Sequence, residues 1–377
     1  MTLSMTLLAA TFLVTTAATA ASPHVTVIDI GAPDYLGSPR IHPQGINDLG
    51  EVVGYGILGG PQPLQAFVWS HGKITLLPAP GADPGLSSFG LALNNRGQVA
   101  GYTTIGGVKH SIIWDGGSFK DISAPGGDSY PIAVNDNGQA LLVEQGKSYI
   151  WSAGSRVPVE PFNVTATVGL NNSGQIFGSG SDDGGPEKAF IWSQGEETQA
   201  SSFGLTTTTT DINNRGQVIG YGAVARPPYH THGYLWSPAV NGRRATQTDI
   251  GSISGRDTEA LAVNDRGQVV GRSATSSGWH AFRWEGGRMT DLGVLPGGTS
   301  SNAVAINEDG QAAGWSYAAD GKRHAVMWNG GKIVDLGIPD GFFLSYAIGI
   351  NKSGQVLGYG FQEGTGAVHT FVWSTAG

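Results

Sequence analysis

Short stretches in which bulky apolar side chains alternate with small or polar ones recur along the chain. In the stretch His280 to Trp284, the side chains of His280, Phe282 and Trp284 fall on one side of an extended backbone, and Ala281 falls on the other. A four-residue block that ends in tryptophan occurs eight times, at Trp69, Trp114, Trp151, Trp192, Trp236, Trp284, Trp328 and Trp373. This period of two predicts a β-strand at each block.

A second phrase recurs between the tryptophan blocks. In all eight repeats it consists of an apolar residue, an asparagine, two variable residues and a glycine. The asparagines are Asn47, Asn94, Asn135, Asn171, Asn213, Asn264, Asn307 and Asn351. Their mean spacing is about 43 residues, which lies in the range of β-propeller blades. The chain is therefore predicted to be a repeat protein.

Each repeat contains four strand candidates, as the sixth repeat illustrates. The candidates there are 259–263, 268–274, 280–284 and 288–292. The first two are joined by Asn-Asp-Arg-Gly, which suits a tight turn with glycine in the left-handed region. Four antiparallel strands per repeat define a propeller blade, so we expect an all-β fold.

The repeat resembles that of a known family. The tripeptide His280-Ala281-Phe282, Trp284, the sequence TDLG at 290–293 and the phrase from Ala305 to Gln311 are similar to the HAF repeat family, a group of predicted extracellular bacterial proteins named after the tripeptide. The resemblance extends over essentially the whole chain after residue 24. It implies secretion and repetition, but no established activity.

The two ends of the repeat region predict how the ring closes. Residues 25–31, VTVIDIG, match the fourth-strand phrase, whereas the last repeat stops after its third strand, TFVWSTAG. We therefore expect an eight-bladed β-propeller whose N-terminal strand completes the last blade and removes two exposed sheet edges. A seven-bladed or open arrangement is the alternative. The third repeat, with its very short loop, and the fifth, which starts in the run 206–210, are expected to be distorted.

The N-terminal 21 residues have a different composition from the repeats. They are apolar and end in Ala18-Thr19-Ala20, a pattern typical of a secretory signal peptide. Residues 22–377 would then form a single propeller domain that is secreted, extracellular or periplasmic. The segment lacks the Lys or Arg that a signal peptide usually has near its start. A short membrane anchor is the alternative, because the apolar run is just long enough to span a bilayer. No membrane association is expected after cleavage.

Charge and cysteine content narrow the range of partners. The formal net charge is −8, which argues against a nucleic-acid partner because such a partner requires a basic surface. The chain contains no cysteine, so disulfides, thiolate catalysis and cysteine metal sites are excluded. We expect no cofactor and no metal, and we expect a monomer.

Polar residues that recur at one place in every repeat are assigned to structure. The position of His280 carries histidine in five repeats and Lys or Gln in the other three, which favours a hydrogen-bonding role. The same reasoning applies to the repeated asparagines, to the Asp of TDLG and to Trp315, which occupies a position where other repeats have tyrosine. His230 and His232 lie two residues apart and could bind a metal together with a third ligand. His232 is itself a repeat position, however, so this spacing is assigned to chance.

Residues that break the repeat are candidates for binding. Long connections are predicted at one end of every blade, so that end is expected to carry function. The candidate ligand-binding residues there are Arg40, His42, Tyr130, Tyr229, His230, Glu259, Trp279, Asn302, Tyr317 and Tyr346. A mixture of aromatic and hydrogen-bonding side chains suits a sugar or an extended polymer.

Two functions remain open at this point. The first is a binding or adhesion module for a polysaccharide or a cell-surface partner. The second is a polysaccharide-degrading enzyme, a glycoside hydrolase or lyase, that would use His42 with Asp257 or Glu259 as an acid and base pair.

Overall fold

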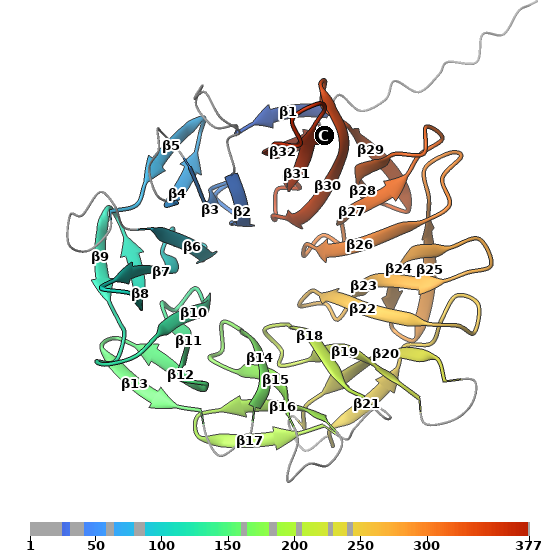
Figure 1. The fold of residues 1–377 in the computed structure, drawn as a ribbon. Helices are drawn as coiled ribbons and strands as arrows, with labels where there is room; N and C mark the ends of the chain where they lie inside the picture. Colours follow the sequence, from blue (N-terminus) through green and yellow to red (C-terminus); the bar gives the residue numbers. More distant parts are fainter. Residues whose placement is uncertain are drawn as a thin grey trace, which may run out of the picture.

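The chain forms a closed ring of eight four-stranded antiparallel sheets (Figure 1). The computed structural model describes residues 25–30, 41–57, 64–78, 87–159, 164–180, 187–200, 206–224, 229–239 and 244–375. All regular elements in these ranges are strands, and they contain no helix that could span a membrane. The protein is therefore an eight-bladed β-propeller, as the repeat predicted. The seven-bladed alternative is wrong, and the expected signal peptide lies outside the described residues.

The first four blades follow the chain order, each from an inner to an outer strand. Blade 1 consists of β2 (Ile41–Ile46), β3 (Val52–Gly56), β4 (Gln65–Ser70) and β5 (Lys73–Leu76). Blade 2 consists of β6 (Ser88–Leu93), β7 (Val99–Ile105), β8 (Val108–Asp115) and β9 (Ser118–Asp121). Blade 3 consists of β10 (Ser129–Val134), β11 (Ala140–Glu144), β12 (Lys147–Ser152) and β13 (Ser155–Pro158). Blade 4 consists of β14 (Val164–Leu170), β15 (Ile176–Gly180), β16 (Lys188–Ser193) and β17 (Glu196–Gln199).

The remaining blades complete the ring. Blade 5 consists of β18 (Thr208–Ile212), β19 (Val218–Ala223), β20 (Thr231–Ser237) and β21 (Thr246–Asp249). Blade 6 consists of β22 (Thr258–Val263), β23 (Val269–Ala274), β24 (Trp279–Glu285) and β25 (Arg288–Gly293). Blade 7 consists of β26 (Ser301–Ile306), β27 (Ala312–Tyr317), β28 (Arg323–Asn329) and β29 (Lys332–Gly337). Blade 8 consists of β30 (Phe342–Ile350), β31 (Val356–Gln362), β32 (Val368–Thr375) and β1 (Val25–Asp29).

The N-terminal strand closes the ring as expected. β1 pairs with β32 along its whole length, from Val25 opposite Thr375 to Asp29 opposite Phe371. The backbone N–H of Ile30 extends this ladder by donating to the carbonyl of Thr370 at 2.9 Å. Blade 8 therefore contains both ends of the repeat region.

The repeated tryptophans fill the spaces between blades. Seven of the eight are buried, and Trp151 is partly exposed. Trp114 of blade 2 packs in one cluster with Val53 and Ala66 of blade 1. The small residue before the aromatic position of one blade thus makes room for the tryptophan of the next, because a strand with a period of two presents alternate residues to opposite neighbours.

The third and fifth repeats, for which the sequence suggested distortion, keep all four strands. Both form four-stranded blades of the same order as the others. Blade 3 keeps its strands because its short connection, Gln145-Gly146, still closes a two-residue hairpin between β11 and β12.

The repeated asparagines form a closed ring of hydrogen bonds on the face that carries the short turns. Each side-chain Nδ2 donates to the backbone carbonyl of the equivalent asparagine in the next blade, at 2.8 to 3.1 Å, and Asn351 donates to Asn47 to complete the circle. All eight asparagines are buried. The turns of neighbouring blades are therefore fastened directly to one another.

Asp211 departs from the repeat on the inner strand β18. The other seven repeats have Gly or Ala at this position. Its two carboxylate oxygens accept hydrogen bonds from the backbone N–H groups of Ile212, at 2.8 Å, and Val263, at 2.9 Å. Burial nevertheless raises its pKa to about 6, and the nearby carboxylate of Asp265 adds to the increase.

This buried carboxylate predicts a pH-dependent stability. The folded protein holds the Asp211 proton more tightly than the unfolded chain, so the folded state binds more protons between about pH 4 and 6. Its contribution to stability is therefore full at low pH and falls by about 2 to 3 kcal/mol as the pH rises through this window. We expect Asp211→Ala to remove this part of the pH dependence, measured by urea unfolding at a series of pH values. Parallel pH profiles for the two proteins would contradict the prediction.

Candidate binding face

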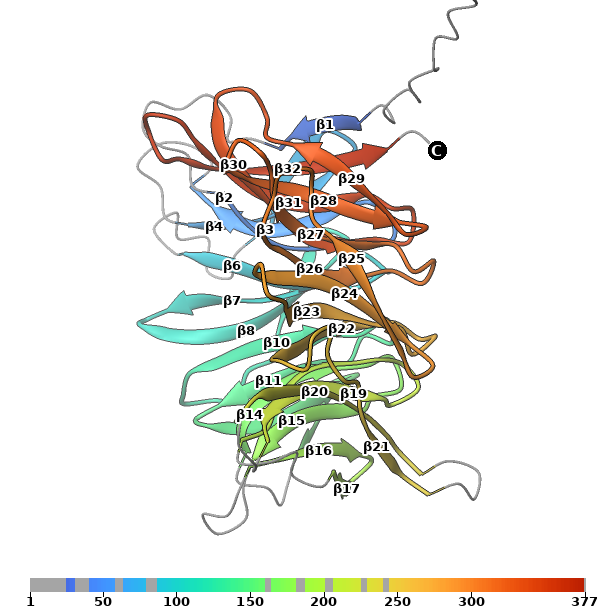
Figure 2. The same cartoon turned by 90° about the vertical axis from the view of Figure 1, so that its right-hand side faces the viewer.

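The two faces of the ring differ in loop length. In blade 6 the turns 264–268 and 286–287 lie on the asparagine face, whereas the connection 275–278 and the longest connection, 294–300, lie on the opposite face. Every inner strand begins at this opposite face, which we call the loop face. Figure 2 shows the ring from its side. The prediction that one face carries the longer connections holds for the connections between blades, such as 122–128, 250–257 and 294–300. It is wrong for the connection between the second and third strands in blades 2 and 3, which is only two residues long, 106–107 and 145–146.

The residue five positions before each repeated asparagine lies on an inner strand, and this position includes the candidates His42, Tyr130, Glu259, Asn302 and Tyr346. Each lies directly opposite a residue of the neighbouring strand, and most of these partners are aromatic or cationic. The pairs are His42 with Tyr55, Phe89 with Tyr102, Tyr130 with Val143, Thr208 with Tyr221, Glu259 with Arg272, Asn302 with Trp315, and Tyr346 with Tyr359. In these seven blades the loop face is therefore built from two strands.

Aromatic rings run continuously across blades 1 and 2. His42 stacks on Tyr55 with the ring centroids 5.1 Å apart, and Tyr55 meets Phe89 of the next blade edge to face at 4.9 Å. Phe89 in turn stacks on Tyr102 at 4.5 Å. These contacts fix the rings in place without burying them fully.

The row continues onto blade 3 through a lysine. The Nζ atom of Lys109 lies 5.5 Å from the ring centroid of Tyr102 and 5.7 Å from that of Tyr130. Tyr130 itself is 39% exposed. The ammonium group thus lies within cation–π distance of two rings on neighbouring blades.

A second aromatic cluster lies on blades 7 and 8. The ring of Trp315 is 5.7 Å from that of Tyr317 and 6.4 Å from that of Tyr346, and Tyr346 lies 5.3 Å from Tyr359. The guanidinium of Arg323 lies among these rings, 4.7 Å from the centroid of Trp315. The sequence assigned Trp315 to a purely structural repeat position, but the structure places it in this cluster.

Blade 6 carries charges that are already paired. Glu259 accepts a hydrogen bond from Arg272 at 2.8 Å, and the guanidinium of Arg272 lies 4.6 Å from the ring centroid of Trp279. Next to it, Asp257 lies 3.5 Å from the Nδ1 atom of His230. Glu259, Arg272 and Trp279 therefore contact one another within blade 6, and His230 and Asp257 form a contact between blades 5 and 6.

The suggested acid and base pair is not brought together. His42 is on blade 1, and two blades lie between it and blade 6, which carries Asp257 and Glu259. The ring of His42 is stacked on Tyr55, and both carboxylates have the partners described above. General acid and base groups must reach the same substrate bond, so no observation here favours the glycosidase alternative.

The other candidate residues are distributed along the same face. Tyr229 is 65% exposed, whereas Asn302 is buried. The Oδ1 atom of Asn302 has no hydrogen-bond partner in the part of the chain that the structure describes. Arg40 lies outside the described residues.

The repeated histidines bond to the outer strand of their own blades. The Nδ1 atom lies 2.7 to 3.0 Å from a carboxylate oxygen in each pair: His110 with Asp121, His232 with Asp249, His280 with Asp291, His324 with Asp335, and His369 with Asp29. These bonds connect the third strand to the fourth, which confirms the structural role inferred from repetition. No group of three or more His, Asp or Glu that could bind a metal occurs in the described ranges.

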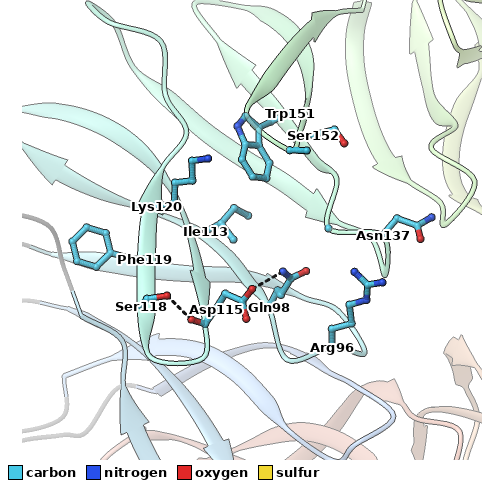
Figure 3. A pocket seen from close by; sticks show the side chains of 12 residues that line it. Arg96, Gln98, Ile113, Asp115, Ser118, Phe119, Lys120, Asn137, Trp151 and Ser152 are labelled. Atoms are coloured by element: carbon cyan, nitrogen blue, oxygen red, sulfur yellow. Dashed lines mark hydrogen bonds between the residues drawn. The ribbon is translucent and has the colours of Figure 1, made fainter.

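A cavity of about 380 Å³ opens between blades 2 and 3 on the asparagine face (Figure 3). The partly exposed Trp151 and the buried Ile113 form an apolar wall. Lys120 lies over Trp151 with its Nζ atom 5.1 Å from the ring centroid, and Asp115 accepts a hydrogen bond from Gln98 at 2.9 Å. This cavity exists because Trp151, unlike the other repeated tryptophans, is not fully covered by the preceding blade.

A second cavity, of about 300 Å³, lies between the same blades on the loop face. It is lined by Asp128, Lys147 and Tyr149, and by Glu144, whose side chain is buried and ion-paired with Arg156. The short connection of the third repeat leaves this gap open. The sequence singled out that connection but did not predict either cavity.

The sequence reasoning missed the cationic residues of the loop face, Lys109, Arg272 and Arg323. Lys109 and Arg323 immediately precede the repeated histidines His110 and His324. A comparison of the residue before the repeated histidine across the repeats would have shown that it varies from blade to blade. The same comparison on the inner strand identified the candidates there.

Comparison with solved structures supports the fold. A structure described as the Dos1 propeller aligns with 94% of this chain and 95% of its own, with 10% identity and a TM-score of 0.53. Dipeptidyl peptidase 4 from Porphyromonas gingivalis aligns with 91% of this chain and 59% of its own, with 9% identity and a TM-score of 0.54. A prolyl endopeptidase aligns with 87% of this chain and 55% of its own, with 12% identity and a TM-score of 0.53.

These similarities define a class of fold and no more. The chain spans less than two thirds of the length of the two peptidases, and identity this low shows the propeller fold alone. No protein-family model and no curated protein sequence matches the chain. The resemblance to the HAF repeat family therefore rests on the repeated motifs only.

Proposed function

We propose that this chain is a secreted β-propeller of the HAF repeat type and that its loop face binds a polysaccharide or another polymer of a cell surface. The observation that carries the proposal is the row of aromatic side chains that crosses blades 1 to 3 and the second cluster on blades 7 and 8. The signal-like N-terminal segment supports an extracellular location.

Physical chemistry favours an extended ligand over a small one. The rings are held by contacts with one another, so they lose little conformational entropy when a ligand binds. They are also partly exposed and distributed over several blades, which suits a flat polymer with apolar ring faces and hydroxyl edges.

Removing the exposed ring of Tyr130 and the partly exposed ring of Trp279 from the loop face should weaken binding. We expect the double variant Tyr130→Ala, Trp279→Ala to bind its polysaccharide at least about tenfold more weakly, because two contact surfaces are lost. The wild-type protein is first screened on a glycan array and a polysaccharide panel, and the affinities are then measured by isothermal titration calorimetry.

The matched control is Phe119→Ala on the outer strand of blade 2. Phe119 is 41% exposed and therefore as accessible as Tyr130, but it lies on the outer strand β9, away from the inner strands of the loop face. We expect this variant to bind like the wild type. If the wild type binds no polysaccharide in the screen, or if the double variant binds as tightly as the wild type, the proposed function is wrong.

A further inference from the structure

Arg323 occupies an aromatic cage on the loop face. It is the first residue of β28, and its Nε atom donates a hydrogen bond to the hydroxyl of Tyr317 at 3.0 Å. Its Nη1 atom donates to the hydroxyl of Tyr346 on the next blade. The centre of the guanidinium lies 4.7 Å from the ring of Trp315, 5.1 Å from that of Tyr317 and 5.4 Å from that of Tyr346.

The charge of Arg323 is not neutralised by the protein in the described ranges. No ion pair there includes Arg323, whereas Arg272 on the neighbouring blade is paired with Glu259. Burial by itself would lower the pKa of Arg323, but the hydrogen bonds to the two hydroxyls raise it above its ordinary value. The side chain is therefore a permanent cation with neutral partners only.

The cage leaves part of the guanidinium available. A guanidinium has five N–H donors in one plane, and the two tyrosine hydroxyls accept from two of them. The remaining donors bond to no described residue. An arginine whose plane is already fixed can bind a planar, bidentate anion with little further loss of side-chain entropy.

A second cation without an ion pair lies at the corresponding position of blade 2. Lys109 and Arg323 both immediately precede a repeated histidine, and each lies against aromatic rings of its own and the next blade. The ion pairs within the described residues do not include Lys109 either. The chain has a net charge of −8, so two cations without ion pairs on the loop face differ from the acidic character of the chain as a whole.

We propose that the loop face recognises an acidic polysaccharide and that Arg323 binds the carboxylate of a uronic acid in it, an inference that rests on the proposed polysaccharide-binding function. The sugar rings contact the aromatic row, and the carboxylate lies in the plane of the guanidinium. A carboxylated polymer with one charge per sugar suits two isolated cations. A densely sulfated polymer favours a protein with an excess of basic residues, whereas this chain has 21 Lys and Arg against 29 Asp and Glu.

The test compares polymers that differ only in charge. The probes are polygalacturonate and the same polymer with its carboxylates methyl-esterified, and dextran and dextran sulfate serve as the neutral and sulfated references. The full chain is titrated with each by calorimetry. We expect polygalacturonate to bind at least about tenfold more tightly than its ester, and the difference to decrease as salt is added.

The variants assign the difference to one side chain. Arg323→Gln should reduce the affinity for polygalacturonate to that for the ester, while Arg323→Lys, which keeps the charge but not the planar pair of donors, should recover only part of it. Arg283→Gln on β24 removes the same charge elsewhere and should change neither affinity. Tyr317→Phe removes only the hydroxyl that orients Nε, so it tests the cage if Arg323→Gln proves unstable; a smaller loss of affinity for polygalacturonate is expected.

Each other outcome overturns a specific statement. Equal binding of polygalacturonate and its ester would overturn the carboxylate site and leave the proposed function standing. Tighter binding of dextran sulfate than of polygalacturonate would overturn the choice of a carboxylate. Unchanged affinity in both Arg323→Gln and Tyr317→Phe would overturn the role of Arg323, and binding to none of the probes or the wider panel would overturn both proposals.

Discussion

Replacing Asn264 by aspartate is expected to lower the free energy of unfolding by about 3 kcal/mol at pH 7. The buried Nδ2 atom of Asn264 donates to the carbonyl of Asn307 at 2.9 Å and to Oε1 of Gln268 at 2.7 Å. Its Oδ1 atom accepts from the backbone N–H groups of Arg266 and Gln268. Aspartate is nearly isosteric and keeps the two accepted bonds, but it places a carboxylate oxygen against a carbonyl oxygen. Urea unfolding measures the loss.

The pH dependence of the Asn264→Asp variant separates this effect from a packing defect. A protonated carboxyl can donate to the carbonyl of Asn307, so the folded state should raise the pKa of the new aspartate above its unfolded value. The loss relative to the wild type should therefore be largest above about pH 6 and shrink as the pH falls toward 4. A loss that does not change with pH would show that the donated bond is not its cause.

Asp309→Ala is the matched control on the same face. The side chain of Asp309 is 63% exposed and lies 3.7 Å from Arg266, so its removal should cost less than about 0.5 kcal/mol. If Asn264→Asp is no less stable than this control, the asparagine ring does not fasten the blades.

Deleting residues 25–30 is expected to lower the melting temperature by at least about 5 °C and to promote association of the chain. The deletion removes the ladder between β1 and β32 and leaves the edge of β32 unpaired. It also removes Ile30, which is buried in a cluster with Ile41 of blade 1 and Val372 of blade 8. Differential scanning calorimetry and light scattering measure the two effects.

A substitution within β1 controls for changes of composition. Val27 and Ile28 are 44% and 39% exposed, so replacing both by threonine keeps the strand while changing its outer surface. This variant should stay within about 1 kcal/mol of the wild type. Unchanged melting of the deletion variant would mean that the ring does not depend on its closing strand.

The tight turns were predictable from sequence, but the bonds between them were not. The phrase around Asn264 indicates a turn because Asn and Gly are the residues that such a turn requires, and the structure has Gly267 at a φ of +79°. The bond from Asn264 to Asn307 joins residues that are 43 apart in the chain. Only the curvature of the closed ring brings these two turns within bonding distance.

The candidate site was predictable in part. Reading the inner strand for variation located His42, Tyr130 and Tyr346 on the loop face, because loop length identified that face correctly. Arg323 was missed because its function depends on rings from two blades. A single strand contains no information on which side chains of the neighbouring strand lie opposite it.

The sequence by itself determined the architecture of this protein. The period of two predicts the strands, the period near 43 predicts the blades, and the fourth-strand phrase at the N-terminus predicts how the ring closes. These patterns lead to a ring because each blade can bury its apolar face only against another blade. The tertiary structure alone decided which side chains meet across blades: those of the asparagine ring, of the cavity beside Trp151, and of the cage around Arg323. Those contacts depend on the register and angle between sheets, which are set by the packing of the whole ring.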